Sequence, residues 1–132
     1  MDIEETQHQG RVPVTVFHLK GDLNMTSYQQ LEAKGREAHA AGVRDLVLDL
    51  SGVTFISSAG IRAINGLFLL LRTSDPSESD EARRAGLRAG TFKSPHLKLL
   101  NPPRRVQEAL SIAGVDMFLE IHRSLDEAIA SF

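Results

Sequence analysis

The chain of 132 residues contains no cysteine and no tryptophan, and only one tyrosine. Without cysteine it forms no disulfide bond, has no thiol nucleophile and offers no thiolate ligand to a metal. With so few large aromatic rings it has little surface on which the bases of a nucleic acid could stack. These absences exclude disulfide-stabilised folds and thiol chemistry, and they disfavour nucleic-acid binding.

Long apolar runs are also missing. The longest is Leu67–Leu71, which is far short of the roughly 18 residues that a membrane span needs. The N-terminus, Met-Asp-Ile-Glu-Glu, is acidic where a secretory signal would be basic. We therefore expect a cytoplasmic protein without membrane insertion.

Charge of one sign is not concentrated anywhere in the chain, whose formal net charge is −2. Residues 1–72 carry seven Lys or Arg against eight Asp or Glu, residues 73–95 carry four against four, and residues 96–132 carry four against five. Nucleic-acid binders usually gather their basic residues on one face. We expect no direct nucleic-acid partner.

The remaining composition is that of an ordinary globular protein, with 42% hydrophobic and 24% charged residues. A chain of this length fits one domain with a real core. We expect a single domain over residues 1–132. The polar, serine-rich segment 73–95 is too long for a usual connection, and we expect it to be an inserted flexible loop.

Apolar patterns along the chain alternate between strands and helices. The segment 46–50 is apolar on both faces, which is typical of an inner strand of a parallel sheet, and from Ile61 the apolar period becomes helical. The whole pattern predicts an α/β fold with a mixed, mainly parallel sheet of four to five strands, packed by about four helices. Further strands are expected at residues 3–7, 12–20 and 96–100, a weak edge strand at 115–121, and further helices at 26–41, 101–113 and 124–132.

Helix starts show the usual cap residues. Residues 26–29 and 124–127 match the capping-box pattern, in which a Ser or Thr caps the helix and a Glu or Gln follows three residues later. Asn101 stands where a cap residue would open the helix that follows the strand at 96–100.

Two serines, Ser57 and Ser58, lie where the central strand passes into the next helix. The first N–H groups of a helix have no partner within it, and the helix dipole is positive there. Such a place suits an anion, including a phosphate attached covalently to a serine. Serine is also a favoured helix cap, and the spacing alone favours that simpler role.

The segment 49–61, with the sequence DLSGVTFISSAGI, resembles the central motif of the STAS family. This fold is shared by bacterial anti-sigma factor antagonists and the cytoplasmic domains of sulfate transporters. Residues 21–23 and 110–115 extend the resemblance over most of the chain. In antagonists of the family a partner kinase phosphorylates the serine that opens the helix after the third strand, which switches binding off. The resemblance implies that Ser58 is the phosphoacceptor, with Ser57, which stands where many members have aspartate, as the second choice.

The resemblance also implies a function and its partners. Unphosphorylated, such an antagonist binds an anti-sigma factor that is a serine protein kinase, and so frees a sigma factor for transcription. ATP would belong to the kinase, and the domain itself would need no cofactor. The alternative is a non-switching STAS scaffold or regulatory subunit of a transporter or multiprotein signalling complex, in which Ser58 only caps the helix.

Several residues near the two serines are candidates for partner contact, each with a simpler explanation. Small side chains early in the helix would let a partner approach closely, or would allow tight packing on the sheet. A turn aspartate and two polar helix residues would contact the partner, or would only be solvated. The candidate contacts are Asp22, Ser57, Ser58, Ala59, Gly60, Arg62 and Asn65. Leu69 and Leu70 widen the apolar surface of the same helix, which indicates contact with a second copy or a partner.

Catalysis by Ser58 is a weaker hypothesis. A nucleophile elbow also sets a serine between strand and helix, but it requires Gly-x-Ser-x-Gly, and Ser-Ser-Ala-Gly lacks the first glycine. His96 and His122 follow in the sequence, but nothing in the sequence places either beside Ser58. The five histidines include no i, i+4 pair. We expect neither enzymatic activity nor a metal site.

Overall fold

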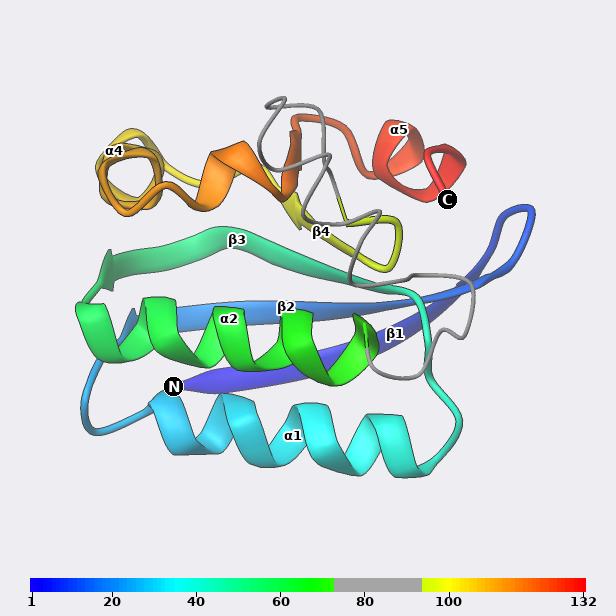
Figure 1. The fold of residues 1–132 in the computed structure, drawn as a ribbon, viewed down its shortest axis with the longest axis horizontal. Coiled ribbons are helices and arrows are strands. Elements are labelled where there is room, and N and C mark those ends of the chain that lie inside the picture. The colour runs from blue at the N-terminus through cyan, green and yellow to red at the C-terminus, as the bar shows by residue number, and fades with distance from the viewer. Residues whose placement is uncertain (73–93) are drawn as a thin grey trace.

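The structure is a computed structural model that describes residues 1–72 and 94–132. Five strands, four α-helices and one short 3₁₀ helix follow one another along this part of the chain (Figure 1). They are β1 (Asp2–Gln9), β2 (Pro13–Leu23), α1 (Tyr28–Ala40), β3 (Leu46–Ile56), α2 (Ser58–Arg72), β4 (Leu97–Leu100), α4 (Arg104–Ile112), η1 (Val115–Met117), β5 (Glu120–His122) and α5 (Leu125–Ala130).

The five strands form one sheet in the order β1-β2-β3-β4-β5. β1 and β2 are antiparallel, and every later pair of neighbours is parallel. Parallel neighbours need a crossover connection, which α1 supplies between β2 and β3 and α4 supplies between β4 and β5. The predicted α/β fold with a mixed, mainly parallel sheet is confirmed.

The two faces of the sheet differ in how much apolar surface they bury. Successive side chains of a strand point to opposite faces, so each strand contributes to both. One face lies under α1, α2 and α4 and forms the large core, which includes Phe17, Leu19, Leu48, Leu50, Ile64, Leu67 and Leu99. The other face forms a small core under α5, made of Val14, Val16, Val47, Leu100 and Ala128.

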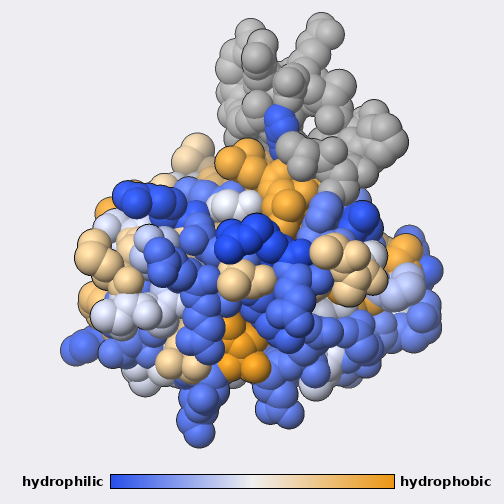
Figure 2. Space-filling model, turned by 90° about the horizontal axis from the view of Figure 1, so that it is seen from below, coloured by the Kyte–Doolittle hydropathy of each residue, from blue (hydrophilic) through white to orange (hydrophobic). Residues whose placement is uncertain are grey.

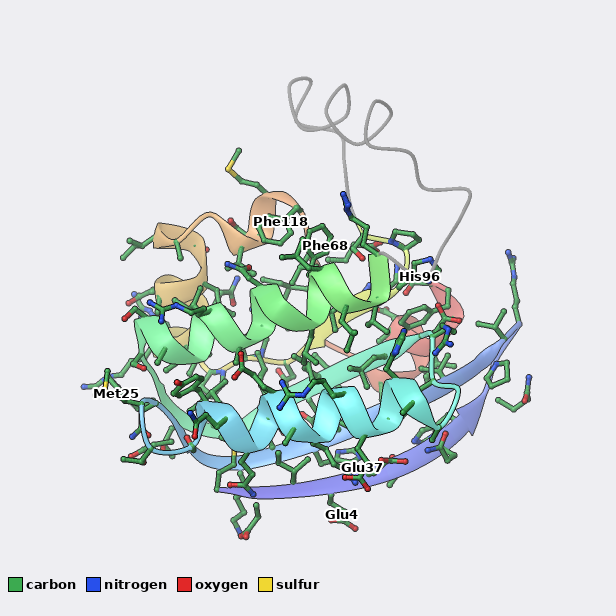
Figure 3. All side chains as sticks on the ribbon, turned by 60° about the horizontal axis from the view of Figure 1, so that its bottom comes forward. Glu4, Met25, Glu37, Phe68, His96 and Phe118 are labelled. Atoms are coloured by element: carbon green, nitrogen blue, oxygen red, sulfur yellow. The ribbon has the colours of Figure 1, made fainter. Side chains whose placement is uncertain are left out.

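Helices α1 and α2 pack side by side on the covered face (Figures 1 and 3). Gly35 of α1 faces Leu67 of α2 so closely that a Cβ atom at position 35 would overlap the leucine side chain. The opposite side of α1 carries polar residues, and the surface seen from below is mainly hydrophilic (Figure 2). α1 is therefore amphipathic, with its small residues at the contact and its polar residues in water.

The start of α1 differs from the prediction. The predicted cap was Thr26, but the helix begins after Ser27. The Ser27 hydroxyl does not cap the helix; it donates to the Asp22 carbonyl (2.6 Å) and accepts from the Asn24 N–H (3.0 Å). Ser27 is buried beneath this turn, so its hydroxyl bonds the end of β2 instead of the first turn of α1.

Of the caps predicted for the two later helices, the one at Asn101 is wrong and the one at Ser124 is confirmed. Asn101 does not cap α4, since it adopts a left-handed conformation (φ 49°), its N–H donates to the His122 carbonyl, and the cap position is Pro103. Ser124 does cap α5, because its hydroxyl accepts from the Glu127 N–H at 3.5 Å.

The predicted flexible loop at 73–95 falls mostly outside the described residues, which resume at Ser94. Ser94 is buried, and its N–H donates to the Phe118 carbonyl at 2.8 Å. Within the two described ranges, no helix is both long enough and apolar enough to pass through a membrane.

Candidate functional site

The two serines at the end of β3 have different environments. Ser57 lies just before α2, its N–H donates to the Leu23 carbonyl (3.0 Å), and its carbonyl accepts from the Ile61 N–H (3.0 Å). The Ser57 hydroxyl accepts from the Gly60 N–H (3.4 Å), so Ser57 acts as the helix cap. Ser58 is the first residue of α2 and its side chain is exposed. Of the two hydroxyls, the one at Ser58 is open to an enzyme.

Ala59 and Gly60 lie inward, which fits tight packing on the sheet, one of the two roles predicted for them. Ala59 is 5% exposed and Gly60 is buried. A Cβ atom at position 60 would come within 2.5 Å of the Leu23 carbonyl oxygen and 3.0 Å of the Ile56 side chain. These small residues let the first turn of α2 lie against the ends of β2 and β3, so they support Ser58 from beneath.

Asp22 reaches the same end of the molecule from β2. It pairs with Phe55 in the register of β2 and β3, one residue before the Leu23–Ser57 hydrogen bond. Its carboxylate Oδ1 accepts from the Thr54 hydroxyl at 2.6 Å. The structure therefore places the exposed Asp22 side chain near the ends of β2 and β3, the strand that leads into α2.

Arg62 and Asn65 follow Ser58 along α2. Arg62 is exposed one turn after Ser58, and four residues along a helix return to the same face. Asn65 is only partly exposed, and its Oδ1 is buried without a hydrogen-bond partner among the described residues. Of these two predicted contacts, Arg62 is the better placed beside Ser58.

Two exposed apolar residues at this end were missed by the sequence analysis. Met25 is 78% exposed and Phe55 is 54% exposed. Met25 lies in the turn before α1, at the end of the molecule where α2 begins (Figure 3). Phe55 is exposed because β4 pairs only with residues 46–49 of β3, so the last part of β3 has no strand on that side. We call Asp22, Met25, Phe55, Ser58 and Arg62 the Ser58 surface.

A second polar group lies on the sheet face opposite the large core. His18 Nδ1 lies 2.7 Å from Asp49 Oδ2, and His18 Nε2 lies 2.9 Å from Thr6 Oγ1. The same Thr6 oxygen lies 2.9 Å from His8 Nε2. We call these four residues the open-face network; it links β1, β2 and β3.

The carboxylate of Asp49 is the charged end of this network. Burial raises the pKa of Asp49, but hydrogen bonds from Ser51 and His18 more than offset that effect, and the pKa lies below its ordinary value. Asp49 is therefore an ionised acceptor that orients His18, and its side chain is already engaged within the sheet.

A buried lysine on β4 is also paired. Lys98 Nζ lies 2.6 Å from Glu120 Oε2 and 5.0 Å from the centre of the Phe132 ring. Burial raises the pKa of Glu120, but the hydrogen bond and charge of Lys98 outweigh it and the pKa is lowered. The same carboxylate lies 3.1 Å from His122 Nε2. Lys98, Glu120 and His122 are therefore paired with one another.

The histidines that a serine hydrolase would need lie far from Ser58. His96 is bonded to Asp45 (2.9 Å), just before β3, and the 11 residues of β3 place its start about 30 Å from its end. His122 lies in the row of Asp49, about 20 Å before the end of β3. Neither histidine can therefore act as the base that the nucleophile-elbow hypothesis requires beside Ser58. Within residues 1–72 and 94–132, no three His, Asp or Glu side chains are grouped as metal ligands.

Solved structures of similar fold support the topology. An anti-sigma factor antagonist from Mycobacterium paratuberculosis is 17% identical, with 98% of this chain and 93% of that chain covered and a TM-score of 0.69. The unphosphorylated form of the anti-sigma factor antagonist SpoIIAA is 19% identical, with 96% and 93% covered and a TM-score of 0.67. The phosphorylated Bacillus SpoIIAA gives 20% identity, 96% coverage of both chains and a TM-score of 0.58.

A sulfate transporter family protein from Wolinella succinogenes has the same fold, at 18% identity, 89% and 82% coverage and a TM-score of 0.55. No curated protein sequence matches the chain significantly. The family model of the STAS domain matches residues 5–75, which is more than half of the chain and includes β3, both serines and all of α2. The chain belongs to the STAS domain family.

Proposed function

We propose that this STAS domain is an anti-sigma factor antagonist whose binding is switched off by phosphorylation of Ser58. The observation that carries the proposal is the contrast between two adjacent hydroxyls, with Ser57 bonded as the helix cap and Ser58 exposed. The similarity in fold to anti-sigma factor antagonists, including SpoIIAA in both phosphorylation forms, supports it.

The partner in this proposal is an anti-sigma factor that is also a serine kinase. The kinase would transfer the γ-phosphoryl group of ATP, so that the bond to the leaving ADP oxygen breaks and a bond to Ser58 Oγ forms. The hydroxyl proton would pass to a base of the kinase. The domain contributes the acceptor and needs no cofactor, and both proteins would act in the bacterial cytoplasm.

Phosphorylation would change the docking surface without unfolding the domain. The phosphate adds about 1.5 to 2 negative charges at the positive end of a helix, where anions are stabilised. A partner surface that had closed over a neutral hydroxyl would instead have to desolvate a dianion, which is costly. Partner binding would therefore be lost while the free energy of unfolding stays the same or rises.

The apolar residues of the Ser58 surface fit a protein partner. Met25 lies in a turn whose backbone is fixed by hydrogen bonds: the Thr26 N–H donates to Asn24 Oδ1 and the Ser27 N–H donates to the Asn24 carbonyl. Because this backbone is ordered before binding, a partner that covers the side chain does not have to order the turn as well. Met25 and Phe55 would anchor the partner at the same end of the domain as Ser58.

The second candidate is a STAS scaffold or a regulatory subunit of a transporter or multiprotein signalling complex. The similarity in fold to a sulfate transporter family protein favours this candidate. In such a protein Ser58 would remain unmodified, and binding would not depend on phosphorylation.

Mass spectrometry after incubation with the cognate kinase and ATP separates the two candidates. The antagonist would gain one phosphate, on Ser58, and the Ser58→Ala chain would gain none. The Ser57→Ala chain serves as the matched control and would still be modified at position 58. Tight binding of the kinase without any phosphate on Ser58 would favour the scaffold.

A further inference from the structure

Arg62 is the basic residue of α2 that stands closest to Ser58 along the helix. Residues four apart lie on one face of a helix, with their Cβ atoms about 6 Å apart. Long helical side chains also lean toward the N-terminus, which carries the guanidinium of Arg62 back toward the first turn. Both side chains are exposed, so each is free to move toward the other.

No carboxylate competes for Arg62 on its own helix or from the neighbouring strand. The first turn of α2 contains no acidic residue. Asp22 is the acidic residue at the end of β2, and its Oδ1 accepts from the Thr54 hydroxyl. Among the described residues, Arg62 takes part in no ion pair within 4.0 Å. On the packed helix α1, the Glu32 carboxylate lies beside Gly66, which is one turn further along α2 than Arg62: a Cβ atom at position 66 would lie 3.8 Å from Glu32 Oε2. Glu32 forms no ion pair with Arg62 either, so the Arg62 charge is available to a new anion at Ser58.

We propose that a phosphate on Ser58 draws Arg62 into an ion pair within α2, which removes the Arg62 guanidinium from the docking surface. This inference depends on the proposed function, because it assumes that Ser58 carries the phosphate. A phosphoserine with an arginine at i+4 has the favourable order, with the negative group nearer the N-terminus of the helix. The modification then changes two contacts at once: it adds negative charge at Ser58 and takes a positive charge away from the partner.

The pair has a consequence that can be measured on the isolated protein. The second pKa of a phosphoserine is near 6, and a nearby cation lowers it by stabilising the dianion. An exposed i, i+4 pair is expected to lower it by about 0.3 pH unit. Phosphoserine can be installed at position 58 by genetic code expansion, so the measurement needs no kinase.

The experiment is a pH titration followed by ³¹P NMR on the full chain with phosphoserine at position 58. The Arg62→Gln chain is compared with the unsubstituted chain and with the Arg11→Gln chain. Arg11 is an exposed arginine in the turn between β1 and β2, at the opposite end of β2 from Asp22. We expect Arg62→Gln to raise the phosphate pKa by about 0.3 pH unit and Arg11→Gln to leave it unchanged. Equal pKa values in all three chains would overturn the inference.

This result is independent of the outcome with the kinase. A kinase that fails to modify Ser58 would remove the proposed function, while the ³¹P titration would still report whether the pair forms. Conversely, a phosphate pKa that is the same in all three chains would overturn the proposed ion pair between phosphoserine 58 and Arg62, but it would not contradict the proposed phosphorylation of Ser58. Arg62 is exposed, so the thermal unfolding of the Arg62→Gln chain should match that of the unsubstituted chain and confirm that the variant folds.

Discussion

The Ser58 surface and the open-face network both use β2 and β3, but their side chains are bonded differently. In the network each polar side chain is hydrogen-bonded to the next, in a chain that crosses three strands. On the Ser58 surface Ser58 and Arg62 are exposed, and the large apolar side chains of Met25 and Phe55 lie in water. Groups that already have partners stabilise the fold, whereas exposed groups on a rigid support are available to another molecule.

The largest expected change in stability is at Gly60, which packs beneath the Ser58 surface. Gly60→Ala places a Cβ atom 2.5 Å from the Leu23 carbonyl oxygen, and neither backbone can move easily. We expect a loss of about 3 kcal/mol in the free energy of unfolding, measured by urea titration.

Gly66→Ala, on the same helix, is the matched control. A Cβ atom there meets only Glu32 Oε2, at 3.8 Å. It should stabilise the domain by about 0.5 to 1 kcal/mol, since alanine is the better helix former. Similar stability of the Gly60→Ala and Gly66→Ala chains would show that the first turn of α2 is not held tightly against β2.

A smaller effect, on binding and not on folding, is expected at the apolar residues of the Ser58 surface. Met25→Ala and Phe55→Ala should each weaken binding to the anti-sigma factor about tenfold, because each removes a large side chain from the contact. Both variants should keep the free energy of unfolding within about 0.5 kcal/mol, since both side chains are exposed. Isothermal titration calorimetry measures the affinity.

Leu69→Ala is the control for these two variants. Leu69 is also about half exposed on α2, but lies eleven residues after Ser58, or about 16 Å along the helix. Its replacement should leave the affinity unchanged. If Leu69→Ala weakened binding as much as Phe55→Ala, the docking surface would lie elsewhere on α2, where a dimer or partner contact is also predicted.

Substitutions in the open-face network are expected to affect folding and not binding. Asp49→Asn should lower the free energy of unfolding by about 1 kcal/mol at pH 7 and leave partner binding unchanged. Because the pKa of Asp49 is lowered in the native state, the stabilisation is present above the ordinary carboxyl pKa of 3.8. It is lost as the pH falls through the native pKa.

Urea titrations between pH 2 and pH 7 check this dependence. The difference between the unsubstituted and Asp49→Asn chains should shrink below about pH 4. Glu37→Gln is the matched control, because Glu37 is exposed on α1, which covers the other face of the sheet (Figure 3). A difference between the unsubstituted and Asp49→Asn chains that stayed constant over the whole range would contradict the assignment of an ionised, hydrogen-bonded Asp49.

The sequence predicts the central part of the fold because the signal there is local. An apolar strand, two serines and a helical stripe follow one another within residues 46–71, and the structure has β3 and α2 in these places. The caps at Thr26 and Asn101 were predicted wrongly for two different reasons. The Ser27 hydroxyl bonds the Asp22 carbonyl, five residues earlier at the end of β2, in a turn that the capping-box pattern does not describe. The Asn101 N–H bonds the carbonyl of His122, the last residue of β5, and no pattern within one segment reports such a distant contact.

Only those residues of the Ser58 surface whose exposure depends on local sequence could be predicted. The exposure of Ser58 and Arg62 follows from the helical period of α2. The burial of Gly60 depends on how far β2 extends, and the exposure of Phe55 depends on β4 ending early beside β3. Both depend on strand lengths elsewhere in the sheet, which the local sequence around Ser58 does not contain.

The central claim is that the charge at Ser58 controls binding without disturbing the domain. The most direct test compares the affinities of Ser58→Ala and Ser58→Asp for the cognate anti-sigma factor, with thermal unfolding measured on both. We predict that Ser58→Ala binds as the unsubstituted chain does, and that Ser58→Asp binds at least tenfold more weakly, a change of about 1.4 kcal/mol, at an unchanged unfolding temperature. Equal affinities of the two folded variants would contradict the account.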